Sequence, residues 1–309
     1  MAFVIDANLD CEAVWSGVSL PGKVAHRISL YGALLAVLAP EDEDAVELWT
    51  PVAIDPARYR GPWPVRFHAG VPPRADLAWA HRQAKTANDR RLALAVAAHH
   101  GMALPGARVI TSADEIDVPG PWVAKLPWTA AGRDRARGVG PPTAEQRVHL
   151  GRLLAPCGAL ILEPWCDRIL DVGVCAHVDV SGLVIAQPPH TIVTDARGGF
   201  VGIDLAEPAL SPDERTQLST IVAGAGAAIA AEGYSGHFAI DAFAYRDGDA
   251  RRFRPLCEIN ARLSFGWIAR AYAKRLGTTR LGFGPPPPEL EAARVLITPA
   301  TDGITAWIA

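Results

Sequence analysis

Apolar and polar positions form their clearest pattern near the carboxyl end of the chain, between residues 236 and 266. Two apolar runs, 238–245 and 253–259, flank the polar segment Arg-Asp-Gly-Asp at 246–249. Apolar runs of this length around a short turn that contains glycine are typical of a β-hairpin. The pattern therefore predicts two adjacent antiparallel strands, and the rest of the chain is interpreted around them.

Each arm of this hairpin carries an acid at a position where a buried strand favours an apolar side chain. The acids are Asp241 and Glu258, and side-chain alternation places Asn260 on the same face as Glu258. Two carboxylates ~4 Å apart repel each other by ~4 kcal/mol at an effective dielectric of ~20, so they need a shared proton, a base or a cation. Two carboxylates and an amide oxygen are hard ligands that suit Mg²⁺. Pairing of the acids with Arg252 or Arg254 is the alternative that the sequence leaves open.

The remaining pattern predicts a mixture of helices and strands. Helical spacing of apolar residues, with capping residues such as Thr143 and Ser211, indicates the helices. Short apolar runs between turn residues indicate the strands. The predicted helices are 24–38, 77–85, 88–100, 143–154, 212–232 and 267–276, and the predicted strands are 2–5, 46–54, 107–111, 121–126, 159–165, 169–180, 184–188 and 199–203, with a terminal hairpin of 293–298 and 304–308.

A lysine interrupts the short apolar strand 121–126. Lys125 is one of only four lysines in a chain that otherwise uses arginine, and a lysine within an apolar strand needs an anionic partner. A compact ammonium group suits a phosphate oxygen. The small-residue loop 127–135 follows, and such loops let backbone N–H groups approach phosphates closely. An ordinary turn beside a lysine that reaches solvent is the alternative.

A second apolar strand, 159–165, ends in the sequence Glu163-Pro164-Trp165. Proline has no N–H group and interrupts strand pairing, so we expect an unpaired edge at this strand end. Unpaired backbone groups can bind a flat polar ring such as adenine. Asp171 follows near the start of the next predicted strand.

Composition and charge narrow the classes of partner. The 309 residues are half hydrophobic, which is enough for a large core and two or three subdomains. The net charge of −3 gives no indication of a nucleic-acid or membrane-surface partner, and no apolar run reaches the ~20 residues of a bilayer span. The sequence shows no signal peptide, and its five cysteines contain no CxxC pair. These features predict a cytoplasmic protein with reduced core thiols, with a zinc site or catalytic thiol as a minor alternative.

The order of the three signals resembles the ATP-grasp superfamily. The lysine strand with its loop comes first, the strand that ends in Glu-Pro-Trp second, and the acidic hairpin third. The segment Glu258-Ile259-Asn260-Ala261-Arg262 is similar to the ExNxR strand end of that family. Asn88-Asp89-Arg90 resembles its Asn-Asp-Lys segment, with arginine in place of lysine. The likeness covers residues 85 to 277.

This resemblance implies an α+β or α/β chain with the ATP-grasp fold, in which two α+β subdomains clasp ATP after a small α/β N-terminal domain. The implied division is 1–84 for the N-terminal domain, 85–168 for the lid subdomain with its lead-in helices, and 169–309 for the C-terminal subdomain. Family members often dimerise, so a homodimer is considered, although the sequence shows no interface signal.

The resemblance also implies an ATP-dependent carboxylate–amine ligase with ATP and Mg²⁺ as cofactors. Small-molecule carboxylate and amine substrates would be joined through an acyl phosphate. An ATP-grasp phosphotransferase and a non-catalytic nucleotide-binding module are the alternatives. The implied roles are Lys125 and Arg262 for catalysis, Asp241, Glu258 and Asn260 for Mg²⁺, and Lys125, Thr129, Ala131, Gly132, Arg133, Glu163, Trp165 and Asp171 for ATP.

Two positions depart from the family pattern. The loop has one glycine, Gly132, where many members have several, so its grip on phosphate is expected to differ. Ala239 stands two residues before Asp241, where the D-alanine–D-alanine ligase branch has a catalytic arginine. The sequence therefore argues against that branch and does not indicate the substrate.

Overall fold

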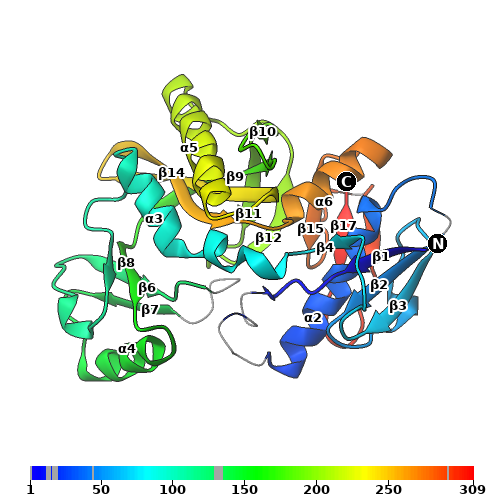
Figure 1. The fold of residues 1–309 in the computed structure, drawn as a ribbon, viewed down its shortest axis with the longest axis horizontal. Helices are drawn as coiled ribbons and strands as arrows, with labels where there is room; N and C mark the ends of the chain where they lie inside the picture. Colours follow the sequence, from blue (N-terminus) through cyan, green and yellow to red (C-terminus); the bar gives the residue numbers. More distant parts are fainter. Residues whose placement is uncertain (1, 12–14, 16–19, 44, 129–134, 291) are drawn as a thin grey trace.

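The computed structural model describes residues 2–11, 15, 20–43, 45–128, 135–290 and 292–309. The predicted phosphate-loop residues Thr129, Ala131, Gly132 and Arg133 lie outside these described residues. The described chain contains three β-sheets with helices packed against them (Figure 1).

The first sheet is parallel and lies at the N-terminal end of the chain. Its strands are β1 (Phe3–Asp6), β2 (Val46–Thr50), β3 (Val65–Ala69) and β4 (Leu77–Ala78), in the order β3-β2-β1-β4. The predicted helix 24–38 is an α-helix, α2 (Gly22–Gly32), that continues as a 3₁₀ helix, η1 (Ala33–Leu38).

The predicted helix 77–85 is wrong. Leu77 and Ala78 instead pair with Ile5 and Asp6 as strand β4. A 3₁₀ helix, η3 (Arg82–Asn88), follows. Sheet pairing with a strand 72 residues earlier in the chain overrides the helical spacing of the apolar residues here.

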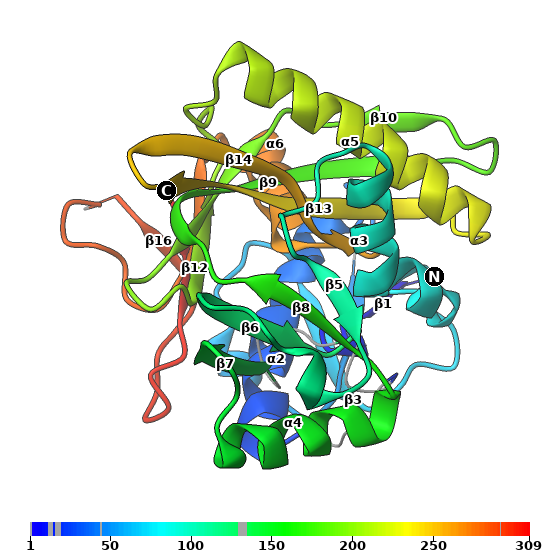
Figure 2. The same cartoon turned by 90° about the vertical axis from the view of Figure 1, so that its left-hand side faces the viewer.

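The second sheet is antiparallel and forms what we call the lid sheet. Its strands are β5 (Arg108–Ile110), β6 (Pro121–Lys125), β7 (Arg135–Val139) and β8 (Leu160–Pro164), in the order β5-β8-β6-β7. Helix α4 (Ala144–Cys157) packs on it, and the predicted cap Thr143 forms a capping box with Gln146 (Figure 2). The lid sheet has an apolar core of its own, which includes Trp122 and Leu150.

The third sheet has nine strands and is the largest element of the fold. Helices α3 (Arg90–His99) and α5 (Pro212–Ala231) cover one face, and α6 (Phe265–Leu276) packs near β9 (Figures 1 and 2). The strand order is β14-β13-β9-β11-β12-β15-β17-β16, with β10 paired to β9. The strands are β9 (Asp167–Val178), β10 (Val184–Ala186), β11 (His190–Thr194), β12 (Phe200–Asp204), β13 (Gly236–Asp247), β14 (Ala250–Asn260), β15 (Arg280–Phe283), β16 (Arg294–Ile297) and β17 (Ala306–Ile308).

Several sequence predictions are confirmed in this sheet. The acidic hairpin is β13 and β14, and the terminal hairpin is β16 and β17. Ser211 caps α5 through a capping box with Glu214, and α6 ends at Gly277, whose φ of 72° suits glycine.

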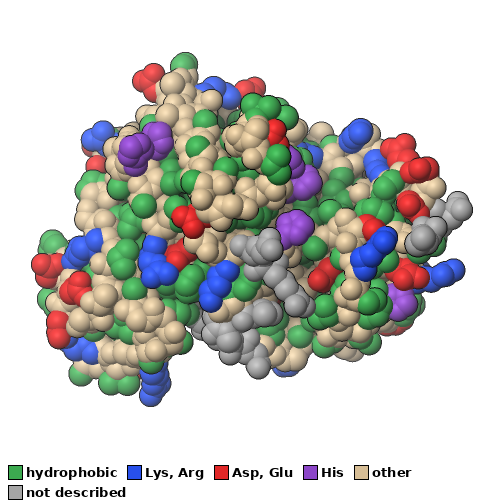
Figure 3. Space-filling model, in the orientation of Figure 1, with side chains coloured by type: hydrophobic (Ala, Val, Ile, Leu, Met, Phe, Trp, Pro, Cys, Tyr) green, Lys and Arg blue, Asp and Glu red, His purple; other side chains and the backbone are tan. Residues whose placement is uncertain are grey.

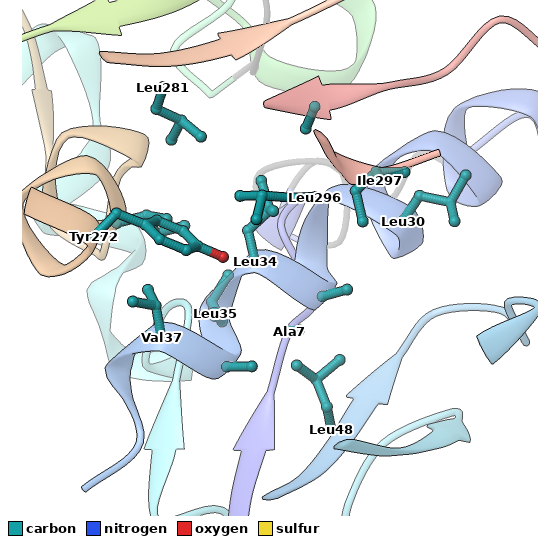
Figure 4. Packing of buried hydrophobic residues seen from close by; sticks show 14 of the residues in the cluster. Ala7, Leu30, Leu34, Leu35, Val37, Leu48, Tyr272, Leu281, Leu296 and Ile297 are labelled. Carbon is teal, nitrogen blue, oxygen red and sulfur yellow. The ribbon is translucent and has the colours of Figure 1, made fainter. Parts of the chain in front are cut away.

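The first and last parts of the chain share one apolar core. Leu34 and Leu35 of η1 lie close to Tyr272 of α6 and to Leu296 and Leu281 of the terminal strands (Figure 4). The N-terminal parallel sheet is therefore packed against the C-terminal end of the large sheet. The division of the chain into domains that end at residues 84 and 168 stays a prediction.

Two further predictions concern membrane-spanning segments and the cysteines. Within the described parts of the chain, no helix combines the length and the apolar composition that crossing a membrane requires. All five cysteines are described, and none forms a disulfide. Only Cys175 is buried, so the prediction of core thiols is correct for this residue and wrong for the four half-buried ones.

Asn88 fastens η3 to the end of β14 and gives a test of the fold. Its Nδ2 donates to the carbonyl oxygens of Ala84 (2.7 Å) and Ala261 (3.2 Å), and its Oδ1 accepts the Ala261 N–H (2.9 Å).

Asn88→Ala leaves these buried groups without partners, which should cost about 2–4 kcal/mol of unfolding free energy. Chemical denaturation measures the loss. The exposed turn variant Asp249→Ala should change stability by less than about 0.5 kcal/mol, and an equal effect of both variants would contradict this account.

Candidate functional site

The acidic pair of the hairpin lies side by side on one face of the large sheet. Asp241 and Glu258 are direct cross-strand partners, and Gly173 of β9 flanks Asp241 on its other side. The residues of a cross-strand pair project to the same face of a sheet. The opposite face is apolar and packs against α3 and α5. The two acids therefore share the face that those helices leave uncovered.

The proximity of the two acids changes the charge state of Asp241. Burial and then the neighbouring Glu258 raise the pKa of Asp241 to about 7, while Arg262 and a hydrogen bond with Asn260 act in the opposite direction. Arg262 also donates from Nη2 to Oδ1 of Asn260 at 2.8 Å. The structure thus brings Asp241, Glu258, Asn260 and Arg262 together in one cluster.

The partner of Glu258 comes from a distant part of the chain. Arg90 at the start of α3 donates to Oε1 of Glu258 at 2.7 Å, and the same guanidinium donates to the carbonyl oxygen of Leu126 at 2.8 Å. Arg90 therefore links the large sheet to the segment after β6. Sequence reasoning singled out Arg90 only as a substitution in the Asn-Asp-Lys segment and missed this contact.

The alternative that the sequence left open, in which Asp241 and Glu258 pair with Arg252 or Arg254, is wrong. Arg252 lies 3.6 Å from Asp247 at the end of the hairpin, and Arg254 pairs with Glu163 of the lid sheet. The bulge between Asp241 and Phe243 shifts the register, so that Arg254 stands opposite Phe243.

Lys125 faces a buried carboxylate within the lid sheet. Its Nζ lies 2.6 Å from Oε2 of Glu163, while Arg254 of β14 donates to the other oxygen of the same carboxylate. Burial alone would raise the pKa of Glu163, but Lys125 and Arg254 outweigh it and hold this pKa well below its usual range. One carboxylate thus compensates two cations, so the Lys125–Glu163–Arg254 trio carries a net positive charge.

The predicted unpaired edge at Glu163-Pro164-Trp165 is wrong. Strand β8 lies inside the lid sheet between β5 and β6, and the Trp165 N–H donates to the Pro121 carbonyl oxygen at 2.9 Å. The indole of Trp165 is instead partly exposed, and the guanidinium of Arg137 lies 3.6 Å from the centre of its ring.

Asp171 lies on β9 opposite Phe243, and it shares the sheet face of Asp241, which precedes Phe243 by two residues on β13. Its carboxylate accepts from Arg168 at 2.9 Å. Whether Asp171 binds a ligand stays a prediction, as do the ligand roles of Glu163 and Trp165.

Further arginines surround Lys125. Arg135 is its cross-strand partner on β7, and Arg137 follows on the same face. Burial and the neighbouring cations, Arg168 among them, lower the pKa of both β7 arginines. Among the described residues, no carboxylate pairs with Arg135 or Arg137. The sequence interpretation missed this excess of positive charge, although an arginine at the end of the small-residue loop and a second one two residues later were visible.

The acidic cluster itself is small. In the described parts of the chain, no group of three or more His, Cys, Asp or Glu side chains is placed to hold a metal ion. The candidate set has only two carboxylates, with the Asn260 amide beside them. This set suits a hard cation that takes part of its shell from another molecule.

Solved structures share this architecture over the length of the chain. An N5-carboxyaminoimidazole synthetase from Staphylococcus aureus aligns with a TM-score of 0.62 at 9% identity, covering 100% of this chain and 94% of that one. An L-amino acid ligase from Bacillus licheniformis aligns with a TM-score of 0.57 at 11% identity, covering 100% and 92%. A biotin carboxylase from Campylobacter jejuni, solved as a β,γ-ATP complex, aligns with a TM-score of 0.54 at 12% identity, covering 99% and 86%.

This chain has the ATP-grasp fold. No protein-family model matches the sequence, and no curated protein matches it either. The ATP-grasp likeness is therefore carried by the backbone arrangement, and it confirms the fold that the three ordered signals predicted.

The Lys125–Glu163–Arg254 trio gives a prediction for stability. Glu163→Gln removes the buried negative charge and leaves two cations facing each other, which should cost about 3–5 kcal/mol. Urea unfolding at pH 7 measures the difference. Asp117→Asn, which removes the acid of an exposed pair with Arg108, is the control and should cost less than about 1 kcal/mol. A Glu163→Gln variant as stable as the control would show that the trio is not coupled as described.

The raised pKa of Asp241 gives a prediction for pH dependence. Its ordinary value is 3.8 and its value in the fold is about 7, so the fold favours the protonated acid. The wild-type protein should therefore lose stability as pH rises from about 4 to 7, and Asp241→Asn should avoid this loss. In EDTA, the variant should be more stable by on the order of 4 kcal/mol at pH 8, with the difference vanishing near pH 4. Melting temperatures of both proteins between pH 4 and 8 test this prediction. A stability difference between them that does not change with pH would refute it.

Proposed function

We propose that this protein is an ATP-dependent ligase that activates a carboxylate as an acyl phosphate and transfers the acyl group to an amine. The observation that carries the proposal is the in-register pair of Asp241 and Glu258, which faces the cation-rich lid sheet within an ATP-grasp fold. Such a pair is electrostatically unfavourable without a cation, and ATP brings Mg²⁺ and phosphates together.

The metal ligands that we propose are Asp241, Glu258 and Asn260. Arg90 contacts Oε1 of Glu258 and leaves the other oxygen of this carboxylate available, and Asn260, which accepts from Arg262 through Oδ1, would contribute its side-chain oxygen. The raised pKa of Asp241 fits this set, because a divalent cation would compensate both causes of it, the burial of the carboxylate and the repulsion by Glu258. When bound, Mg²⁺ would neutralise phosphate charge.

The nucleotide contacts that we propose lie on the lid sheet and beside it. Lys125 would bind phosphate oxygens, held in place by Glu163, and the net positive charge of the Lys125–Glu163–Arg254 trio favours a polyanion. Glu163, Trp165 and Asp171 are proposed to frame the adenosine. Thr129, Ala131, Gly132 and Arg133 keep the phosphate-loop role that the family resemblance implies for them.

The chemistry follows from positioning and charge. A carboxylate oxygen attacks the γ-phosphorus, the bond to the β–γ bridging oxygen breaks, and ADP leaves. The amine then attacks the acyl carbon and phosphate departs with its bonding electrons. Arg262 would steady the transferring phosphoryl group, because its guanidinium is held beside the acidic pair by Asn260.

The partners that we propose are ATP, a small carboxylate and a small amine. The C. jejuni biotin carboxylase in its β,γ-ATP complex and the B. licheniformis L-amino acid ligase support a ligase of this class. A cytoplasmic location and a homodimer stay predictions.

Removal of the Glu258 charge tests the function. Glu258→Gln keeps the side-chain shape but should lower ADP release by about 100-fold or more, because transition-state charge loses its compensation. The measurement is ADP release with a library of carboxylate and amine pairs, followed by mass spectrometry of the product. An amide product supports a ligase, whereas a phosphoester would show a phosphotransferase.

Asp247→Asn is the matched control on the same hairpin. Asp247 is exposed at the far end of β13 and should leave ADP release unchanged. EDTA should abolish release in both proteins. Full turnover by Glu258→Gln, or turnover that survives EDTA, would contradict the proposed role of the acidic pair.

A further inference from the structure

Strand β10 forms an open edge of the large sheet. It pairs with residues 176–178 of β9, and β13 occupies the other side of the same three residues. Among the strands that the structure describes, β10 has no second partner. The outer side of an edge strand leaves backbone N–H and C=O groups unpaired, and these groups are a template for pairing with another chain.

The register of β10 shows which of its backbone groups point outward. The carbonyl oxygen of Leu183 accepts from the Asp179 N–H at 3.1 Å, and the N–H of Gln187 donates to β9 at 2.8 Å. The direction of backbone hydrogen bonds alternates from one residue to the next along an antiparallel strand. Val184 and Ala186 therefore direct their N–H and C=O groups away from β9.

The outward groups of β10 are complementary to those of a second copy of the same strand. Val184 and Ala186 lie symmetrically about Ile185. An antiparallel second copy would place its Ala186 opposite Val184 and its Val184 opposite Ala186, which allows four N–H···O hydrogen bonds. Ile185 would then face Ile185 of the second copy as a non-hydrogen-bonded pair, the kind in which side chains approach most closely.

The side chains of this edge are apolar and two of them are exposed together. Val184 faces α5, since a Cβ on Gly226 of that helix would lie 2.3 Å from Cγ2 of Val184. Leu183 and Ile185 project to the opposite face, where their exposed fractions are 59% and 58%. Figure 3 shows hydrophobic side chains gathered over β10 and the turn before it. Large apolar side chains that are exposed as a group mark a site of association.

The outer surface of α5, the helix that packs on β10, continues this neutral patch. A surface helix normally presents charged side chains to solvent, but residues 216–231 of α5 contain none. Its exposed positions recur every three or four residues and so form one stripe: Thr216, Thr220, Ala223, Ala227 and Ala231. Small side chains on such a stripe allow a second helix to approach to an interaxial distance of about 8–10 Å.

The absence of charge favours a second copy of this chain as the partner. A twofold axis sets a surface patch against itself, so a charged residue near the axis would face a residue of the same charge. Neither residues 180–186 nor residues 216–231 contain a charged side chain, so two copies would meet without this repulsion. A strongly charged partner would find no opposite charge within these two segments.

We propose that two copies of this chain form a symmetric dimer through their β10 edges, with α5 of one copy beside α5 of the other. The pairing joins the two large sheets into one continuous sheet and places both α5 helices on the same face of it. Because β10 has only three residues, the apolar contacts of Leu183, Ile185 and α5 must supply most of the ~1,000 Å² that a stable interface needs. The dimer does not depend on the proposed ligase function.

Sedimentation equilibrium of the full chain tests the dimer. The wild-type protein should show a species of twice the 32.9 kDa chain mass that dissociates on dilution. Ile185→Lys places two ammonium groups opposite each other at the twofold axis and should raise the dimer Kd by about 100-fold or more. Val139→Lys is the matched control, because Val139 is an exposed valine on β7, an edge strand of the lid sheet, and it should leave the Kd unchanged.

A cross-linking experiment tests the register and does not depend on how well the lysine variant folds. In Ile185→Cys, the two thiols of the paired strands would come within the Cα spacing of a disulfide. Mild oxidation should therefore give a covalent dimer on a non-reducing gel. The wild-type chain, with its own five cysteines, and Val139→Cys should remain monomeric on the same gel.

Three outcomes would overturn the proposal. The first is a single 32.9 kDa species at all chain concentrations up to about 100 μM. The second is a dimer that Ile185→Lys leaves intact or that Val139→Lys weakens equally. The third is a failure of Ile185→Cys to cross-link, which would place the interface elsewhere on the molecule.

Discussion

The repulsion between Asp241 and Glu258 is the constraint on which the account depends. The strand register places the two carboxylates next to each other, and the apolar opposite face prevents either from turning away. In the structure the repulsion is reduced by the protonation of Asp241 near neutral pH and by the contact of Glu258 with Arg90. A divalent cation would replace the proton of Asp241 and leave the contact between Glu258 and Arg90 in place.

The same contacts explain how the lid sheet is joined to the large sheet. Each sheet has its own apolar cluster, so burial of apolar surface holds each one together separately. Between them run charged contacts: Arg90 joins Glu258 to the Leu126 backbone, and Arg254 reaches across to Glu163. Both side chains of the Arg254–Glu163 pair are buried, so this contact fastens the lid sheet to the large sheet.

Local pattern was enough to predict the hairpin, the capped helices and the order of the three signals. The hairpin follows from two apolar runs around a turn, and α5 begins where Ser211 and Pro212 predict it. The helix predicted at 77–85 fails because Leu77 pairs with Ile5, a partner that no local pattern reveals. The contact of Arg90 with Glu258 spans 168 residues and that of Arg254 with Glu163 spans 91, so both depend on how the sheets meet.

A crystal structure with Mn²⁺ and a non-hydrolysable ATP analogue tests the central claim most directly, because the anomalous signal of Mn²⁺ locates the cation. We predict an anomalous peak at coordination distance from oxygens of both Asp241 and Glu258, bridged to the phosphates on the Lys125 side. A nucleotide bound elsewhere, or a peak that contacts neither acid, would contradict it.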